Sequence, residues 1–261
     1  MKLIIESWKS FIKEGIENEE HNLKYYAFDW DDNIVQMPTK IMLLDKVGNE
    51  VGMDTESFAH YRGMIGKEEF DYEGVVIKDF APEPFRNFRV IGDNQFLKDI
   101  SSAKPASSWD DFVECINSAS IFAIITARGH KPSTLKRAVY KYIISNHNGI
   151  NSGEVIENIK RYNRIFKKTG KDSSIKGYLD LCKFYPVSFG PAASMSSPEE
   201  AKVKALREFV EYCEKLNKGM PIKIGFSDDD KRNIDLIEKH FSEPRALSTM
   251  TIKYTGKKHG E

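Results

Sequence analysis

Residues 23–33 read LKYYAFDWDDN, and this stretch decides the fold of the chain. Its first six residues are rich in aromatic side chains, which is typical of a β-strand. The strand ends abruptly in acidic residues at positions 29, 31 and 32. A second apolar run, over residues 221–226, ends in the same way at positions 228, 229 and 230. Because ligands of open α/β sheets bind outside the carboxyl ends of the strands, the two acidic clusters predict a ligand site at one sheet edge.

The acidic clusters indicate a bound cation. Clustered carboxylates repel one another unless a positive charge neutralises them. A few oxygen ligands with room for water suit the octahedral shell of Mg²⁺. Acidic residues at strand ends also serve as helix N-caps, but that explanation suits one cluster better than two. The spacing of Asp29, Asp31 and Asn33 imitates a calcium-binding EF-hand loop, yet Ile34 and Lys40 stand where that loop needs glycine and glutamate.

Apolar strands alternate with helical patterns over the rest of the chain. The run IFAII at residues 121–125 is typical of a buried parallel strand. The alternation predicts an α/β fold with a doubly wound, mostly parallel sheet. Further strands are expected near residues 74–77, 88–91, 184–189 and 247–254, and helices over residues 3–19, 109–117, 132–146, 198–217 and 231–241.

The composition argues against several classes of protein. The chain has 39 Lys and Arg against 39 Asp and Glu, so it has no net field to attract nucleic acid or an anionic membrane. No apolar run approaches the ~20 residues of a membrane-spanning helix, and the N-terminus lacks the pattern of a secretory signal. The three cysteines form no CxxC pair, which favours a reducing, cytoplasmic location.

Four segments together resemble the motifs of the haloacid dehalogenase-like (HAD) superfamily. Residues 26–33, YAFDWDDN, are similar to its first motif, a hydrophobic strand followed by DxD. The strand that ends at Thr126 resembles the second motif, and Lys202 near the start of a helix resembles the third. Residues 224–229, IGFSDD, resemble the fourth, a strand that ends in paired acids. The four occur in the family's order, and the resemblance implies a Rossmann-like core with cap insertions.

The resemblance also implies a role for each motif residue. Asp29 would be the nucleophile and Asp31 the general acid and base. Thr126 would hold a phosphoryl oxygen and Lys202 would neutralise developing charge, with Lys204 as the alternative lysine. Asp32 and Asn33 replace the family's usual Gly and Thr. Candidate phosphate contacts are Arg128 and Asn33, and the implied Mg²⁺ ligands are Asp29, the backbone carbonyl of Asp31, and Asp228 or Asp229.

The spacing of the motifs predicts insertions. About 100 residues separate Asp29 from Thr126 and about 80 separate Thr126 from Lys202, whereas a crossover connection needs about 30. In the resembled family both intervals carry caps over the active site. The core is expected at residues 1–47, 106–131 and 184–261, a partly β-structured cap at 48–105, and a second, mainly helical insertion at 132–183. Candidate substrate contacts in the first cap are Tyr61, Arg62, Phe85 and Arg86.

The resulting hypothesis is a Mg²⁺-dependent phosphomonoester hydrolase that works through an aspartyl-phosphate intermediate. One alternative is a nucleotide or nucleic-acid-end phosphatase, because Arg128 follows Thr126 and residues 160–171 are basic, although the neutral chain disfavours it. Another is a non-catalytic binding module of the same fold, which would not need both Asp29 and Asp31. The expected partner is a phosphorylated small molecule or nucleotide, with a nucleic-acid end as the other option and no membrane.

Overall fold

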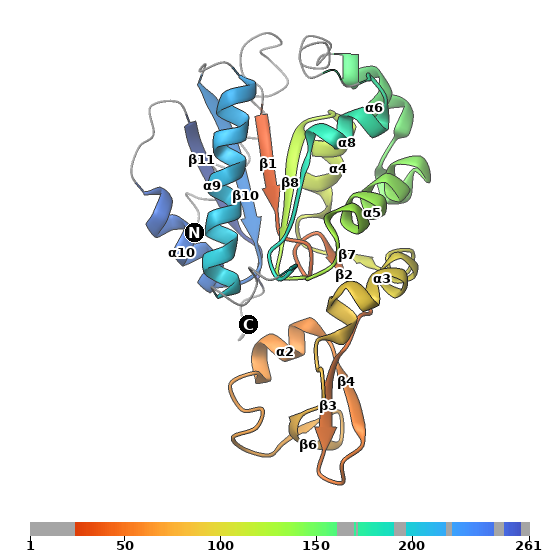
Figure 1. The fold of residues 1–261 in the computed structure, drawn as a ribbon, viewed down its shortest axis with the longest axis vertical. Helices are drawn as coiled ribbons and strands as arrows, with labels where there is room; N and C mark the ends of the chain where they lie inside the picture. The colour runs from red at the N-terminus through yellow and green to blue at the C-terminus, as the bar shows by residue number, and fades with distance from the viewer. Residues whose placement is uncertain are drawn as a thin grey trace.

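A five-stranded, all-parallel sheet forms the centre of the larger part of the computed structural model (Figure 1). Its strand order is β11-β10-β1-β8-β9, so the chain builds outward from β1 in one direction and then returns to build the other half. The expectation of an α/β fold with a mostly parallel sheet is confirmed. The strands are β1 (Lys24–Phe28), β8 (Ile121–Thr126), β9 (Lys183–Pro186), β10 (Ile222–Asp228) and β11 (Ser248–Tyr254).

The structure describes residues 24–160, 170, 172–190, 197–217, 221–242 and 248–256. The helix expected over residues 3–19 and much of the basic stretch at 160–171 lie outside the described residues. Among the helices that are described, none is both long enough and apolar enough to cross a membrane.

Helices cover both faces of the sheet, which explains why every residue of β1 and β8 is buried. On one side α9 and α10 pack against each other and against β10; on the other, α5, α6 and α8 pack together, with α4 against α6 (Figure 1). The four helices expected after residue 105 are confirmed to within two residues. The helices are α4 (Trp109–Asn117), α5 (Pro132–Ile144), α6 (Ser152–Ile159), α8 (Ile175–Leu181), α9 (Pro198–Leu216) and α10 (Lys231–Phe241).

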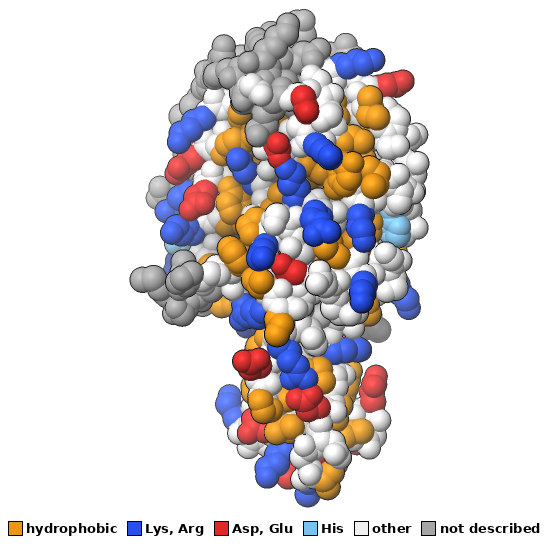
Figure 2. All heavy atoms as spheres, turned by 45° about the vertical axis from the view of Figure 1, so that its right-hand side comes forward, with side chains coloured by type: hydrophobic (Ala, Val, Ile, Leu, Met, Phe, Trp, Pro, Cys, Tyr) orange, Lys and Arg blue, Asp and Glu red, His pale blue; other side chains and the backbone are white. Residues whose placement is uncertain are grey.

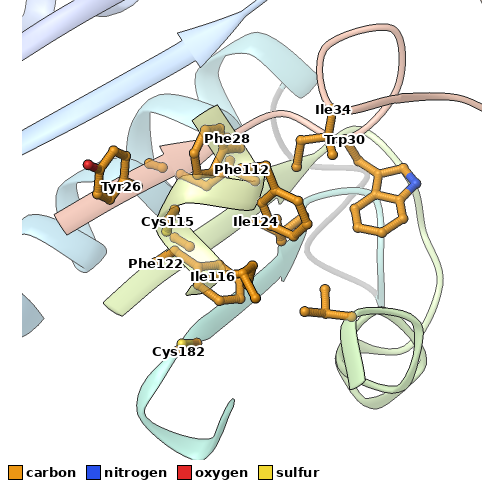
Figure 3. Close-up of a cluster of buried hydrophobic side chains, with 14 of the residues drawn as sticks. Tyr26, Phe28, Trp30, Ile34, Phe112, Cys115, Ile116, Phe122, Ile124 and Cys182 are labelled. Carbon is orange, nitrogen blue, oxygen red and sulfur yellow. The ribbon is translucent and has the colours of Figure 1, made fainter. Parts of the chain in front are cut away.

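Aromatic rings fill the core between the sheet and these helices (Figure 3). Phe112 of α4 meets Phe28 of β1 edge to face, with ring centroids 5.6 Å apart. Trp30, just beyond β1, is fully buried and stacks on Tyr142 of α5 at 6.2 Å. Burial of one such ring contributes roughly 1.5–3 kcal/mol. The residues that follow β1 are therefore anchored by the indole between two of the acidic positions.

The second insertion expected at residues 132–183 is not a separate module. Helices α5, α6 and α8 contribute Tyr142, Val155 and Tyr178 to the same hydrophobic core as the sheet. In the described part of the interval from β8 to β9, α5, α6 and α8 take up much of its length. The described residues of this interval belong to the helical layer of the core.

Residues 41–88 form a small lobe that lies below the core in Figure 1. Its four-stranded antiparallel sheet has the order β4-β3-β6-β5. The small lobe has its own hydrophobic cluster, which includes Leu43, Met53, Phe70 and Ile77. Its elements are β3 (Ile41–Asp45), β4 (Glu50–Met53), α2 (Thr55–Tyr61), β5 (Phe70–Tyr72) and β6 (Val75–Phe80).

The boundaries of the small lobe differ from those expected at 48 and 105. The lobe begins at β3, whose apolar sequence resembles a core strand, and it ends before α3 (Asp93–Asp99), because Phe96 and Leu97 pack into the main core. The strand expected at 88–91 is replaced by two 3₁₀ turns, Arg86–Phe88 and Val90–Gly92. Near the two places where the chain passes between the core and the small lobe, β2 (Val35–Gln36) pairs with β7 (Lys104–Pro105).

Replacement of residues 43–83 by a short Gly/Ser linker should leave the core folded. The cut ends are adjacent, since the N–H of Met42 donates to the carbonyl of Pro84 at 3.0 Å. The lobe also meets the core through partly exposed pairs such as Arg62–Asp230, and pairs of this kind contribute ~0–1 kcal/mol. Thermal unfolding followed by circular dichroism should show a cooperative transition close to that of the full chain. Phe122→Ala, a change in the core expected to lower the free energy of unfolding by ~3–5 kcal/mol, is the positive control. A truncated chain without a cooperative transition would contradict independent folding of the core.

Candidate functional site

The carboxyl ends of β1, β8 and β10 meet at one edge of the sheet. The register pairs Phe28 of β1 with Ser227 of β10 and with Ile124 of β8. Asp29, Asp228 and Thr126 follow at the same edge. The strand order reverses at β1, and such a reversal is where ligands of open α/β sheets bind. The two acidic clusters of the sequence therefore come together as expected.

Lys202 lies between two of these carboxylates. A capping box at Ser197 and a proline in the first turn fix the start of α9, so that Lys202 is buried and Lys204 is exposed. The Nζ of Lys202 donates to Oδ1 of Asp29 at 2.9 Å and to Oδ2 of Asp228 at 2.8 Å. Of the two lysines considered from the sequence, the structure brings Lys202 to the acidic residues.

Burial dominates the electrostatics of this cluster. It raises the pKa of Asp29 to about 8, against the opposing charge of Lys202 and with support from Asp228. Burial together with Asp29 and Asp228 also raises the pKa of Asp229 well above its usual range. Burial alone would lower the pKa of Lys202, but the carboxylates of Asp228 and Asp29 outweigh it and raise that pKa. Asp29 and Asp229 therefore release their protons less readily than ordinary carboxyl groups.

Three carboxylates could hold a metal ion. One oxygen from each of Asp29, Asp228 and Asp229 lies within 4.8 Å of the others. When ionised, these groups and the Lys202 ammonium carry two net negative charges, which a divalent cation neutralises. A donor set made only of oxygens suits Mg²⁺. The carboxylate of Asp31 lies outside the group, so the expected contribution of its backbone carbonyl stays a prediction.

Hydrogen bonding distinguishes Asp228 from Asp229. Besides Lys202, Asp228 accepts from the N–H of Asp230 at 2.9 Å and from Nδ2 of Asn233 at 3.0 and 3.1 Å, one contact to each oxygen. A carboxylate has about four acceptor sites, so those of Asp228 are filled. Among the described residues, no hydrogen-bond donor reaches the carboxylate of Asp229. Asp229 is therefore the better candidate for a direct metal ligand.

Asn33 does not face the expected phosphate position. It is fully buried, and its Nδ2 reaches the carbonyl oxygens of Asp29 at 3.2 Å and Ser227 at 3.1 Å. Its Oδ1 accepts from the hydroxyl of Thr255 at 2.8 Å. These bonds tie the end of β1 to the end of β10 and leave no group for a substrate. The assignment of Asn33 to phosphate binding is therefore replaced by a structural role.

Asp32 occupies the position where the resembled family usually has glycine. Its φ of +55° lies in the left-handed region, which aspartate tolerates better than most residues. Burial raises its pKa to about 7, while a hydrogen bond with Thr55, the first residue of α2, opposes the shift. Asp32 thus makes a contact between the core and the small lobe.

Arg128 binds Asp31 in place of the expected phosphate. Its Nε donates to Oδ2 of Asp31 at 2.7 Å and its Nη2 donates to Oδ1 at 2.6 Å. Thr126 is buried at the end of β8, and its hydroxyl accepts from the N–H of Arg128 at 3.3 Å. The structure therefore brings the predicted acid/base residue and the predicted phosphate contact to each other.

Three of the four candidate contacts in the small lobe serve packing. Tyr61 stacks on Phe70, Phe85 packs edge to face against Phe58, and Arg86 forms an ion pair with Glu50. Arg62 differs, because its Nη2 lies 3.8 Å from a carboxylate oxygen of Asp230 in the core. Arg62 alone of the four is placed next to the site.

Sequence reasoning missed four polar residues at the site: Thr39, Asp93, His130 and Asn233. Asn233 had a weak signal, since it lies in the first turn of the helix that follows the second acidic cluster. Thr39, Asp93 and His130 had none, because their contacts depend on how the small lobe connects to the core.

Comparison with known proteins adds no relative. No family model, curated protein or solved structure matches the chain. The case for a function therefore depends on the residues at the sheet edge and on the motifs that they resemble.

Asp29 should give the metal-free protein a characteristic pH dependence. Its pKa is about 8 in the folded chain against an ordinary value of 3.8, so between these values the folded chain holds a proton that the unfolded chain has lost. The free energy of unfolding should therefore fall as pH rises from about 4 to 8. Urea unfolding in chelator at several pH values should show that Asp29→Asn, which cannot ionise, gains stability relative to wild type over this window. A difference that does not change with pH would contradict the shift.

Proposed function

We propose that the chain is a Mg²⁺-dependent phosphomonoester hydrolase of the HAD type, with a doubly wound core and with the small lobe as its cap. The observation that supports this most is the buried Lys202 ammonium that bridges Asp29 and Asp228. A purely structural ion pair needs no third carboxylate, yet Asp229 joins the group. Such an excess of buried negative charge destabilises a fold, which favours a functional reason for it.

Asp29 would attack the phosphorus atom. Lys202 fixes its Oδ1, and among the described residues no donor reaches Oδ2, which is available as the attacking atom. Attack forms a bond from this oxygen to phosphorus and breaks the bond from phosphorus to the leaving oxygen. The leaving oxygen takes a proton from the carboxyl group of Asp31. The products of this step are an alcohol and an aspartyl-phosphate on Asp29.

Hydrolysis of the aspartyl-phosphate would regenerate the enzyme. Asp31, now a carboxylate, removes a proton from a water molecule, and the oxygen of that water attacks phosphorus. The bond from phosphorus to Asp29 breaks and inorganic phosphate leaves. Throughout, Lys202 stabilises negative charge beside the nucleophile. Mg²⁺, held by Asp29, Asp229 and the carbonyl of Asp31, would reduce the repulsion between nucleophile and phosphate.

The small lobe would select the substrate. The groups at the sheet edge act on the phosphoryl group alone, so the leaving group has to be recognised by other residues. Two contacts connect α2 and the residue that caps its C-terminus to this edge: Thr55 bonds to Asp32, and Arg62 lies beside Asp230. We expect this helix to face the leaving group.

A phosphorylated nucleic-acid end is the second candidate substrate. Figure 2 brings forward the side of the core that carries α5, and Lys and Arg side chains are spread over it. Helix α5 itself contains Lys136, Arg137 and Lys141 and no acidic residue. A local basic face can attract phosphates even on a chain without net charge.

Asp29→Asn should lower Mg²⁺-dependent phosphate release by about three orders of magnitude or more, because an amide cannot attack phosphorus. Release would be measured on sugar phosphates, nucleotides and phosphorylated oligonucleotides. Lys204→Ala, on the exposed face of α9, is the matched control and should retain activity. Turnover of Asp29→Asn within tenfold of wild type would contradict the nucleophile assignment. A wild-type chain that binds Mg²⁺ but hydrolyses none of these substrates would favour a binding module.

The two paired acids should differ in their effect on Mg²⁺. Asp229→Asn should raise the Mg²⁺ concentration needed for half saturation by ~100-fold, and Asp228→Asn, which acts through Lys202 and Asn233, by ~10-fold. Calorimetric titration with Mg²⁺ would measure both, and Ca²⁺ should bind less well in this small donor set. The opposite order of effects would make Asp228 the direct ligand.

A further inference from the structure

Arg128 is an unusual cation because it is almost completely enclosed, with 1% of its side chain exposed. The rings of Phe88 and Phe96 lie over its guanidinium, with centroids 4.5 and 5.0 Å from Cζ. Its edges are occupied by the two bonds to Asp31 and by a bond from Nη2 to the hydroxyl of Thr39 at 3.2 Å. A guanidinium held on its faces and edges has one orientation, and it imposes that orientation on the carboxylate that it binds.

His130 completes the enclosure of Arg128. Its Nε2 lies 3.2 Å from Nη1 of Arg128, and its Nδ1 lies 2.9 Å from a carboxylate oxygen of Asp93. Arginine can only donate, so Nε2 must accept and the single ring proton sits on Nδ1, where it is donated to Asp93. Burial and the charge of Arg128 lower the pKa of His130, which favours this neutral form. Asp93 therefore selects the tautomer that can bind Arg128.

These contacts come from both segments that connect the small lobe to the core. Thr39 lies just before β3, where the chain enters the lobe, and Asp93 is the first residue of α3, after the chain has returned. The return segment also binds the loop after β8, since the N–H of Gly129 donates to the carbonyl of Phe88 at 2.7 Å. A shift of the lobe relative to the core must therefore move partners of Arg128.

We propose that Asp93, His130 and Arg128 form a positioning relay that orients the carboxylate of Asp31. The relay connects this carboxylate to both segments that join the small lobe to the core. The inference rests on the proposed function for the acid/base role of Asp31. In this relay Asp93 and His130 affect proton transfer by Asp31 through their effect on Arg128, and they touch no substrate. They are positioning residues, and their effect should appear in the step that needs a proton at the leaving oxygen.

The test compares two leaving groups. p-Nitrophenyl phosphate has a leaving group that departs without a proton, whereas an alkyl phosphate needs a general acid. His130→Phe keeps a ring beside Phe96 but removes the acceptor for Arg128. It should lower kcat/KM, which reports the step in which the leaving group departs, at least ~10-fold more for the alkyl phosphate than for the aryl phosphate. Arg128→Lys, which loses the two-bond fork, should do so to a greater extent.

Controls separate positioning from simple loss of stability. Tyr178→Phe deletes a buried hydrogen bond to the carbonyl of Ser120 at the opposite end of β8, and it should lower stability without changing the ratio of the two rates. Should His130→Phe fail to fold, Asp93→Ala tests the same relay from its partly exposed end. Asp93→Asn retains an acceptor for Nδ1–H and should recover the ratio that Asp93→Ala loses.

A crystal structure of His130→Phe provides a readout that does not depend on turnover. A displaced Asp31 carboxylate together with a changed rate ratio would support the relay. An intact Asp31–Arg128 fork, or a rate ratio equal to that of wild type, would overturn it. If the wild-type chain hydrolyses no phosphomonoester, the proposed function fails, and the position of Asp31 in the variant structure alone decides whether the relay orients it.

Discussion

The ammonium of Lys202, buried between Asp29 and Asp228, is the interaction on which the rest of the structure depends. A lone ammonium at such depth is costly, and Lys202 is tolerated there because Asp29 and Asp228 both accept its hydrogen bonds. The surrounding chain fixes them independently. The capping box fixes the phase of α9, the parallel register of β1 and β10 fixes the two aspartates, and Asn33 joins the ends of both strands. Asp229 lies in the same group, and burial beside Asp29 and Asp228 raises its pKa well above the usual range.

Much of the core could be predicted from the sequence because its signals are local. A few neighbouring residues are enough to predict a buried strand at 121–125 and a ligand site at the acidic strand ends. Ser197 and Pro198 likewise mark the start of α9. The choice between Lys202 and Lys204 stays open in the sequence, and the burial and contacts of Lys202 in the structure favour it. Side-chain partners carry no such local signal. Asn33 and Arg128 have the chemistry to bind phosphate, but what they bind is decided by groups distant in sequence, namely Ser227 and Asp31. For the same reason the sequence pattern assigns the apolar residues of β3 to the core, whereas they belong to the small lobe.

The core and the small lobe are stabilised by separate sets of apolar contacts. Each encloses its own hydrophobic cluster, and among the described residues the contacts between them include the polar pairs Arg62 with Asp230 and Asp32 with Thr55, together with the Phe88 ring over Arg128. Polar contacts of this kind can be exchanged for water at small cost, whereas apolar contacts cannot. The polar pairs between the lobes therefore add little to the stability of either lobe.

Trp30 has a consequence for how the chain tolerates change in length. Its indole lies in the aromatic core (Figure 3). The acids on either side of it, Asp29 and Asp31, belong to the site. One extra residue before Asp29 would send a carboxylate among the rings and bring the indole to the place of Asp31, beside Arg128. Because both errors arise together, no substitution elsewhere restores the original arrangement. We expect this segment to accept a different large apolar side chain at position 30 far more readily than any insertion or deletion.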